Sequence, residues 1–136
     1  MMQLEEIMTP RVITITPEES ASAAWTRMRR RGIRHLVVID DGHPVGVLSE
    51  RDLGGRAGTS RRRGQTVRSL MTDAVVSAEP DTRVRQAADL MRERLIGSLP
   101  VVDGDQLVGI VTATDVFDAL RADEQPPRLS QSEREM

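Results

Sequence analysis

The chain has 136 residues, enough for a domain of ordinary size with its own hydrophobic core. Cysteine is absent, which excludes disulfides, thiolate metal sites and cysteine nucleophiles. The formal net charge of −2 and the presence of one Trp and one Phe do not favour nucleic acid as a partner, because single-strand binding uses several aromatic platforms.

No apolar segment approaches the roughly 20 residues that span a bilayer. The first residues also lack the basic stretch and apolar run of a signal peptide. The sequence therefore predicts a cytoplasmic protein without a membrane partner. The two histidines, His35 and His43, are too few to predict a metal site.

An internal repeat organises the chain. When the sequence is shifted by 63 residues against itself, residues 7–53 align with residues 70–116 without a gap, and fifteen of these 47 positions are identical. Met8 falls on Met71, Pro17 on Pro80, and Asp52 on Asp115, for example. A period this long indicates duplication of a small domain rather than a solenoid.

Each repeat predicts the same elements in the same order. In the first, residues 12–15 favour a strand, and Thr16 to Glu19 favour a helix start that runs to Gly32. A buried strand at 36–39, a turn, a strand at 45–48 and a helix opening at 49–52 follow. The second repeat predicts a helix from about residue 84, strands at 99–102 and 107–111, and a helix at 114–120.

A single repeat is too short to cover both faces of its sheet. We therefore expect an α+β fold, in which two tandem βαββα repeats pack as a pseudo-two-fold pair. The predicted boundaries are 1–53 for the first repeat with its lead-in segment, 54–69 for a Gly/Arg-rich linker, 70–120 for the second repeat and 121–136 for a disordered tail.

Two interpretations of the linker stay open. It contains five arginines and no acidic residue, and its second half, from Thr66 to Leu70, predicts a lead-in turn. A solvated connection is the simpler interpretation. The other is a flexible basic loop that closes over a phosphate.

Both repeats place Gly-x-x-Ser/Thr-x-x-Asp where the last strand ends. The first repeat has Gly46, Ser49 and Asp52, and the second has Gly109, Thr112 and Asp115. The hydroxyl can donate to a phosphate near free backbone N–H groups, and the carboxylate can accept from ribose hydroxyls. The same spacing also forms a capping box, which needs no ligand. The two interpretations are compatible.

These motifs resemble CBS domains, which pair into a Bateman module. The resemblance rests on Met8-Thr9 and Met71-Thr72, on IRHLVVID at 33–40, and on IGSLPVVD at 96–103 followed by LVGIVT at 107–112. It covers residues 7–53 and 70–120. It implies a regulatory module with two clefts between the sheets that bind AMP, ADP, ATP, S-adenosylmethionine or NAD-type ligands.

The resemblance also implies which residues hold a ligand. It assigns to one cleft Arg34, His35, Ser49, Arg51, Asp52, Thr72 and Ser77. It assigns to the other cleft Thr9, Thr14, Ser98, Thr112, Thr114 and Asp115. The first cleft is therefore the more basic and is suited to a phosphate tail, whereas the second is suited to a less charged adenosyl ligand. A solvated Arg34 and a packed His35 are the alternatives.

A catalytic interpretation has little support. Ser49, His35 and Asp52 are all present, but Ser49 lacks the Gly-x-Ser-x-Gly elbow, and Asp52 is explained by capping. We therefore expect a regulatory ligand sensor that is not an enzyme, that forms a homodimer and that signals to an effector protein. The alternative is a structural dimerisation or interaction module without a ligand.

Overall fold

The structure is a computed structural model that describes residues 2–73 and 76–124. Its elements, in chain order, are η1 (Leu4–Glu6), β1 (Thr14–Ile15), α1 (Ala21–Arg31), β2 (His35–Asp40), β3 (His43–Ser49), α2 (Thr59–Arg62), α3 (Val67–Leu70), β4 (Thr72–Asp73), α4 (Val84–Arg94), β5 (Ser98–Asp103), β6 (Gln106–Thr112) and α5 (Ala113–Glu124). None of the helices within these residues is long and apolar enough to cross a membrane.

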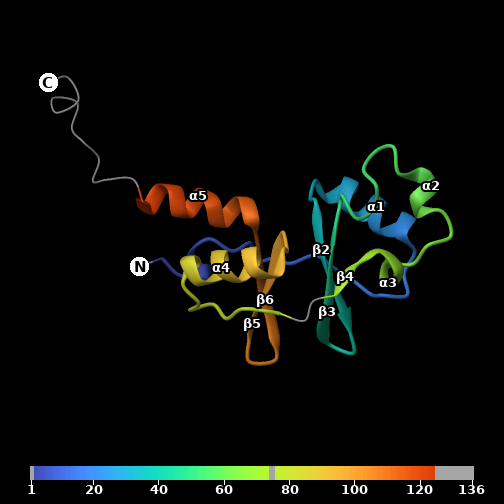
Figure 1. The fold of residues 1–136 in the computed structure, drawn as a ribbon. Helices are drawn as coiled ribbons and strands as arrows, with labels where there is room; N and C mark the ends of the chain where they lie inside the picture. Colours follow the sequence, from blue (N-terminus) through green and yellow to red (C-terminus); the bar gives the residue numbers. More distant parts are fainter. Residues whose placement is uncertain (1, 74–75, 125–136) are drawn as a thin grey trace, which may run out of the picture.

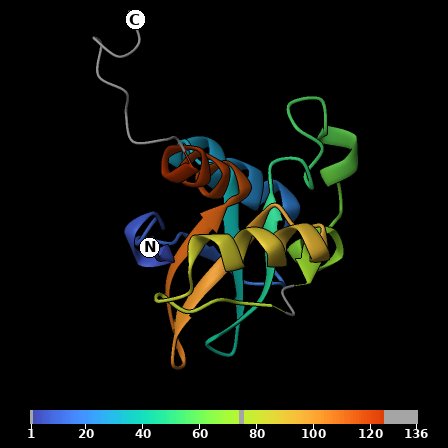
Figure 2. The same cartoon turned by 60° about the vertical axis from the view of Figure 1, so that its left-hand side comes forward.

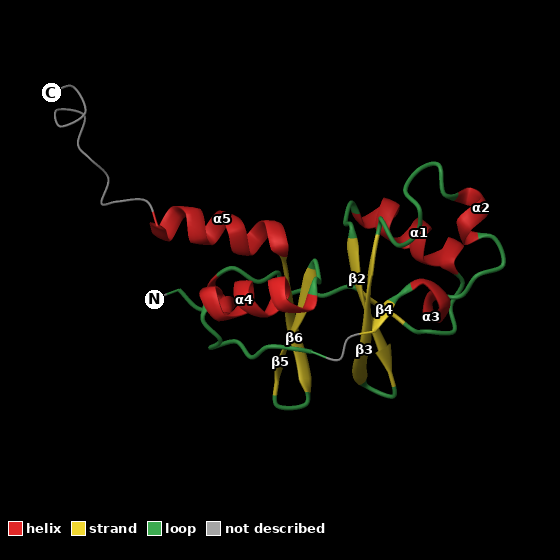
Figure 3. Cartoon of the chain, in the orientation of Figure 1, coloured by secondary structure: helices red, strands yellow, loops and turns green. Residues whose placement is uncertain are grey.

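The two repeats stand side by side with their hairpins roughly aligned (Figures 1 and 2). Helices lie on the outside, and the two sheets face each other, with β3 contacting β5 and β6 (Figure 3). This arrangement confirms the predicted α+β pair of repeats.

Strand alternation divides the buried residues between two environments. Leu36 and Val38 of β2 pack in a core under α1, whereas Val37 between them is buried but lies on the opposite face of the strand, toward the other sheet. In repeat 2, Leu99 and Val101 of β5 pack in the equivalent core under α4 and α5. The continuous apolar strands are thus explained by burial on both faces.

The lead-in segments are exchanged between the repeats. The N-terminal segment lies beside α4, and fully buried Leu4 belongs to the core of repeat 2 (Figure 1). Val67 of α3 is fully buried in the core of repeat 1.

The backbone pairing follows the same exchange. Val47 of β3 pairs with Thr72 of β4, and Ile110 of β6 pairs with Thr9 in the same antiparallel sense. Each repeat therefore completes the sheet of the other.

The first helix begins later than the sequence pattern predicts. Ser20, not Thr16, is the N-cap of α1, and its Oγ accepts from the Ala23 N–H at 3.0 Å. Thr16 instead begins a turn in which its N–H donates to Glu19 Oε2 at 2.9 Å. The lead-in segment of repeat 2 pairs at this point, because the Ala21 N–H donates to the Gln65 carbonyl.

The predicted helix after Ser49 does not form. Residues after β3 make a turn in which Gly54 and Gly55 adopt φ values of +88° and +67°, outside the helical region. The matching residues of repeat 2, Phe117 and Asp118, continue α5, which runs to Glu124, four residues past its predicted end. The rest of the predicted tail, 125–136, lies outside the described residues.

The exchanged segment yields a stability prediction. Leu4→Ala should lower the free energy of unfolding by about 2–5 kcal/mol, because it leaves a cavity in the core of repeat 2. Urea denaturation of Leu4→Ala and of the exposed control Glu5→Ala measures the loss in free energy of unfolding. Equal, small losses in both variants would show that the lead-in segment does not belong to that core.

Candidate functional site

Both Ser/Thr-x-x-Asp motifs form the reciprocal hydrogen bonds of a capping box, around a turn after β3 in repeat 1 and at the start of α5 in repeat 2. The Ser49 N–H donates to Asp52 Oδ2 at 2.9 Å, and the Asp52 N–H donates to Ser49 Oγ at 3.0 Å. In repeat 2, the corresponding bonds between Thr112 and Asp115 are 3.0 and 3.2 Å long. The capping interpretation is therefore confirmed, and each carboxylate keeps Oδ1 outside these bonds.

The capping boxes lie beside the faces where the two sheets meet. Ser49 pairs with His35 across the β2–β3 hairpin, and Thr112 pairs with Ser98 across the β5–β6 hairpin. His35 and Ser98 alternate with Leu36 and Leu99 of the helix-side cores, so they point toward the opposite sheet. Equivalent positions thus carry an imidazole in repeat 1 and a small hydroxyl in repeat 2.

Burial lowers the pKa of His35 below the ordinary histidine value of 6.5. The carboxylates of Asp52 and Asp115 act in the opposite direction, as Glu50 does, while the charge of Arg34 adds to the lowering. His35 therefore interacts with the motif carboxylates of both repeats, and the neutral imidazole is favoured at pH 7.

A cavity of about 200 Å³ lies between the repeats. It is lined by Val47, Thr72, Asp73, Val76, Arg94, Ile96, Ser98 and Pro100. Thr72 and Ser98 thus lie together, although the resemblance assigns them to different clefts. The reason is the strand exchange, which brings β4 beside β3 and opposite β5.

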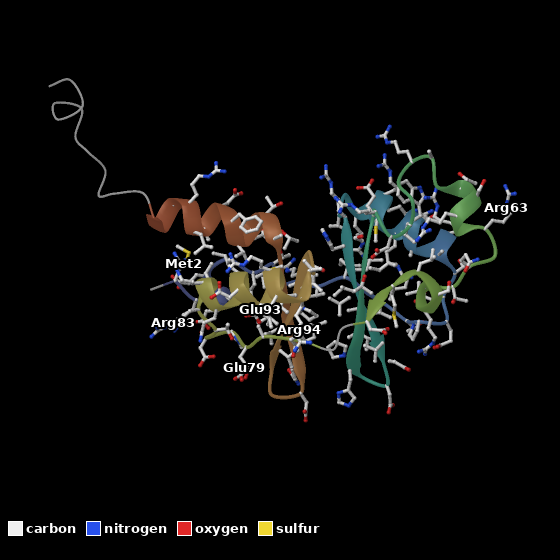
Figure 4. All side chains as sticks on the ribbon, in the orientation of Figure 1. Met2, Arg63, Glu79, Arg83, Glu93 and Arg94 are labelled. Atoms are coloured by element: carbon white, nitrogen blue, oxygen red, sulfur yellow. The ribbon has the colours of Figure 1, made fainter. Side chains whose placement is uncertain are left out.

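Arg94 also lines the cavity, although it is not among the predicted site residues. It lies at the end of α4 nearest repeat 1 and gives the cavity a basic group (Figure 4). The residues predicted for the second cleft include no basic side chain, and Arg94 adds one to this cavity from a position outside the predicted set. In the alignment of the two repeats, Arg94 falls on Arg31, and this identity is the sequence feature that could have pointed to it.

The remaining predicted residues are more dispersed. Ser77 lines a different cavity of about 140 Å³, together with hairpin residues such as His43 and Gly104. Thr9 pairs with Ile110 in the sheet of repeat 2, whereas Thr14 pairs with Val37 in that of repeat 1.

Three of the predicted site residues, Arg34, Arg51 and Thr114, are exposed. Arg34 Nε lies 3.8 Å from Glu50 Oε2, with 83% of its side chain exposed, which favours the solvated interpretation in this state.

The basic segment between the repeats is ordered around one arginine. Arg62 is only 6% exposed, and its Nη1 donates to the carbonyls of Leu53 and Gly55 at 2.9 and 2.7 Å. Its Cζ lies 4.1 Å from the centroid of the Trp25 ring, within cation–π range. A Cβ on Gly58 would collide with the Leu53 carbonyl oxygen, so the tight turn needs glycine there. The solvated interpretation is therefore wrong for Arg62.

The chain belongs to the CBS domain family, whose model matches residues 4–53 and 67–122. The CBS domain-containing protein YhcV of Bacillus subtilis is 32% identical over 117 residues, covering 85% of this chain and 84% of YhcV. The inosine-5'-monophosphate dehydrogenase of Thermoplasma acidophilum is 33% identical over 114 residues, which are 83% of this chain but only 22% of that enzyme.

Solved structures of CBS domain pairs have the same fold. The pair of protein MJ0100, in complex with 5'-methylthioadenosine and S-adenosyl-L-methionine, matches with a TM-score of 0.77 and 27% identity, over 90% of this chain and 98% of that one. CBSX2 in complex with AMP matches with a TM-score of 0.71 and 31% identity, over the same shares of the two chains.

The buried arginine can be tested by Arg62→Met, which keeps an apolar stem but removes the guanidinium donors. We expect the free energy of unfolding to fall by about 2 kcal/mol, because the Leu53 and Gly55 carbonyls lose a charged donor. Urea denaturation measures the free energy of unfolding of Arg62→Met and of the exposed control Arg63→Met, which should be nearly as stable as the wild type. Equal values for the two variants would contradict a structural role of Arg62.

Titration tests the environment of His35. Because its folded pKa is lowered, the unfolded chain binds a proton more readily between that pKa and 6.5, so stability falls as the pH decreases through this window. NMR titration should place the His35 midpoint below 6.5, with His35→Gln assigning the signal. The variant should also lose less stability on acidification than the wild type. A midpoint above 6.5 would mean that the carboxylates outweigh burial.

Proposed function

We propose that the chain is a regulatory module that binds an adenosine-containing small molecule between its two repeats. The observation that carries this proposal is the cavity of about 200 Å³, which reaches Ser98 beside the Thr112–Asp115 capping box. The AMP, 5'-methylthioadenosine and S-adenosylmethionine complexes of similar pairs support the choice of ligand class.

The lining of the cavity suits the parts of such a ligand. Val47, Ile96 and Pro100 offer apolar surface to an adenine ring. Asp115 uses Oδ2 in its capping box, which leaves Oδ1 to accept from ribose hydroxyls. Arg94 would neutralise a phosphate or a carboxylate at the edge of the cavity.

The two clefts are unequal in this proposal. The cleft beside Asp115 has the small side chain of Ser98, whereas the equivalent place beside Asp52 holds the imidazole of His35. We expect the adenosyl ligand to occupy the Asp115 cleft first. A phosphate contact of Arg34, His35 and Arg51 with a ligand in the Asp52 cleft stays a prediction from the sequence.

The proposed role is regulatory rather than catalytic. Ser49 and Asp52 are engaged with each other's backbone, so neither is arranged to activate the other as in a hydrolase. A ligand in the cavity would contact Val47 of repeat 1 and Ser98 of repeat 2, and would favour one arrangement of the repeats. A homodimer would then present that arrangement to an effector protein.

Ligand-dependent melting tests the proposal. AMP, ADP, ATP or S-adenosylmethionine at 100 times its dissociation constant should add about 2.7 kcal/mol of stability and several degrees of melting temperature. Ser98→His should remove the shift, because it gives repeat 2 the side chain that fills the equivalent place in repeat 1. Ser22→His, on the exposed face of α1, is the matched control.

The outcomes separate the alternatives. No shift with any of these ligands would favour the structural dimerisation module. A shift that survives Ser98→His but is lost in Asp52→Asn would place the site in the Asp52 cleft instead.

A further inference from the structure

The arginines are concentrated in one part of the molecule. Residues 27–68 hold eleven arginines and four acidic residues, a formal charge of +7, whereas the whole chain carries −2 and the remainder therefore −9. Where repeat 1 has Arg30, Arg34 and Arg51, the second repeat has Glu93, Gly97 and Thr114. Since repeat 2 adopts the same architecture without these arginines, the fold does not require them.

Specific contacts join the arginine-bearing segments. Arg61 Nε donates to the Asp52 carbonyl at 2.8 Å, which ties α2 to the turn after β3. Arg29 and Arg62 both lie near the Trp25 ring, with Cζ at 5.6 and 4.1 Å from the ring centroid, and the Arg62 contact ties α2 to α1. We call the resulting region the basic surface and define it by six exposed arginines: Arg29, Arg30, Arg51, Arg56, Arg61 and Arg63.

Several of these guanidinium groups are unneutralised. Arg30, Arg51, Arg56 and Arg63 form no ion pair or hydrogen bond through their side chains with any other residue in 2–73 and 76–124. By contrast, Arg68 on α3 pairs with Glu18 and Asp40 at 3.0 and 3.4 Å. Figure 4 shows Arg63 projecting away from α2. Clustered like charges destabilise a folded chain unless a partner neutralises them.

We propose that the basic surface binds an acidic segment of a partner polypeptide. Guanidinium groups pair with carboxylates through two parallel hydrogen bonds, which suits Asp and Glu side chains. The bonds of Arg62 to Leu53 and Gly55 already hold the segment in place, so its ordering costs little on binding. Because Arg61 bonds to the backbone of Asp52, this surface also adjoins one motif of the clefts.

A polypeptide fits the surface better than a nucleic acid does. Trp25, the aromatic residue of this region, already has the Cζ atoms of Arg62 and Arg29 at 4.1 and 5.6 Å from its ring centroid, so a stacking base would compete with these guanidinium groups. A duplex would extend beyond the basic surface, toward parts of the chain that together carry −9. A short acidic peptide contacts the basic surface alone.

Fluorescence anisotropy with a labelled oligoglutamate peptide tests the proposal. The wild type should bind the peptide at low ionic strength, more weakly as salt is added, and should not bind oligolysine. Arg56→Glu/Arg63→Glu should weaken binding by about tenfold or more, since two attractive contacts become repulsive. The matched control Arg83→Glu/Arg121→Glu makes the same charge change on exposed residues of repeat 2 and should bind like the wild type.

Three results would overturn the proposal. The first is no binding of oligoglutamate at low ionic strength. The second is an equal loss in both double variants, which would reflect net charge alone. The third is tighter binding of a short DNA duplex than of the peptide at the same salt concentration, which would identify a nucleic-acid surface. Circular dichroism melting of each variant confirms its fold, and none of these measurements depends on the adenosyl ligand.

Discussion

The exchange of lead-in segments is the contact on which the rest of this structure depends. Leu4 completes the core of repeat 2, and Val67 completes that of repeat 1, so neither repeat has a closed core by itself. The exchange also places β4 beside β3 and Thr9 beside Ile110. The cavity with Thr72 and Ser98 is a direct result, since it needs a strand from each side of the exchange.

Much of the fold was predictable because it follows from local patterns repeated in register. The hairpins were predicted to within three residues, and the capping boxes formed with the predicted partners. The late start of α1 was not predictable from Thr16 to Glu19, because Ser20 became the cap where Gln65 approaches from the other repeat. The helix start at residues 49–52 does not continue, because Gly54 and Gly55 adopt positive φ values where repeat 2 has Phe117 and Asp118.

The candidate site was harder to predict because its parts meet only through tertiary contacts. Thr72 and Ser98 are 26 residues apart, and the cavity also needs Val47 from the other repeat. Arg62 is the middle residue of a run of three arginines, and its neighbours Arg61 and Arg63 are both exposed. Only its approach to Trp25 and to the Leu53 and Gly55 carbonyls distinguishes it, and no spacing rule encodes that approach.

The exchange of His35 for Ser98 at equivalent positions separates the roles of the two repeats. Ser98 leaves space beside Thr112, whereas His35 takes the equivalent space beside Ser49 and interacts with both motif carboxylates. The repeat that holds His35 is also the one that carries the basic surface. If both proposals hold, repeat 2 contributes most of the ligand contacts and repeat 1 contributes the partner contacts. His35 then links ligand binding to partner binding. Burial lowers its pKa, so a ligand that changes the solvation of His35 also changes the charge beside Asp52.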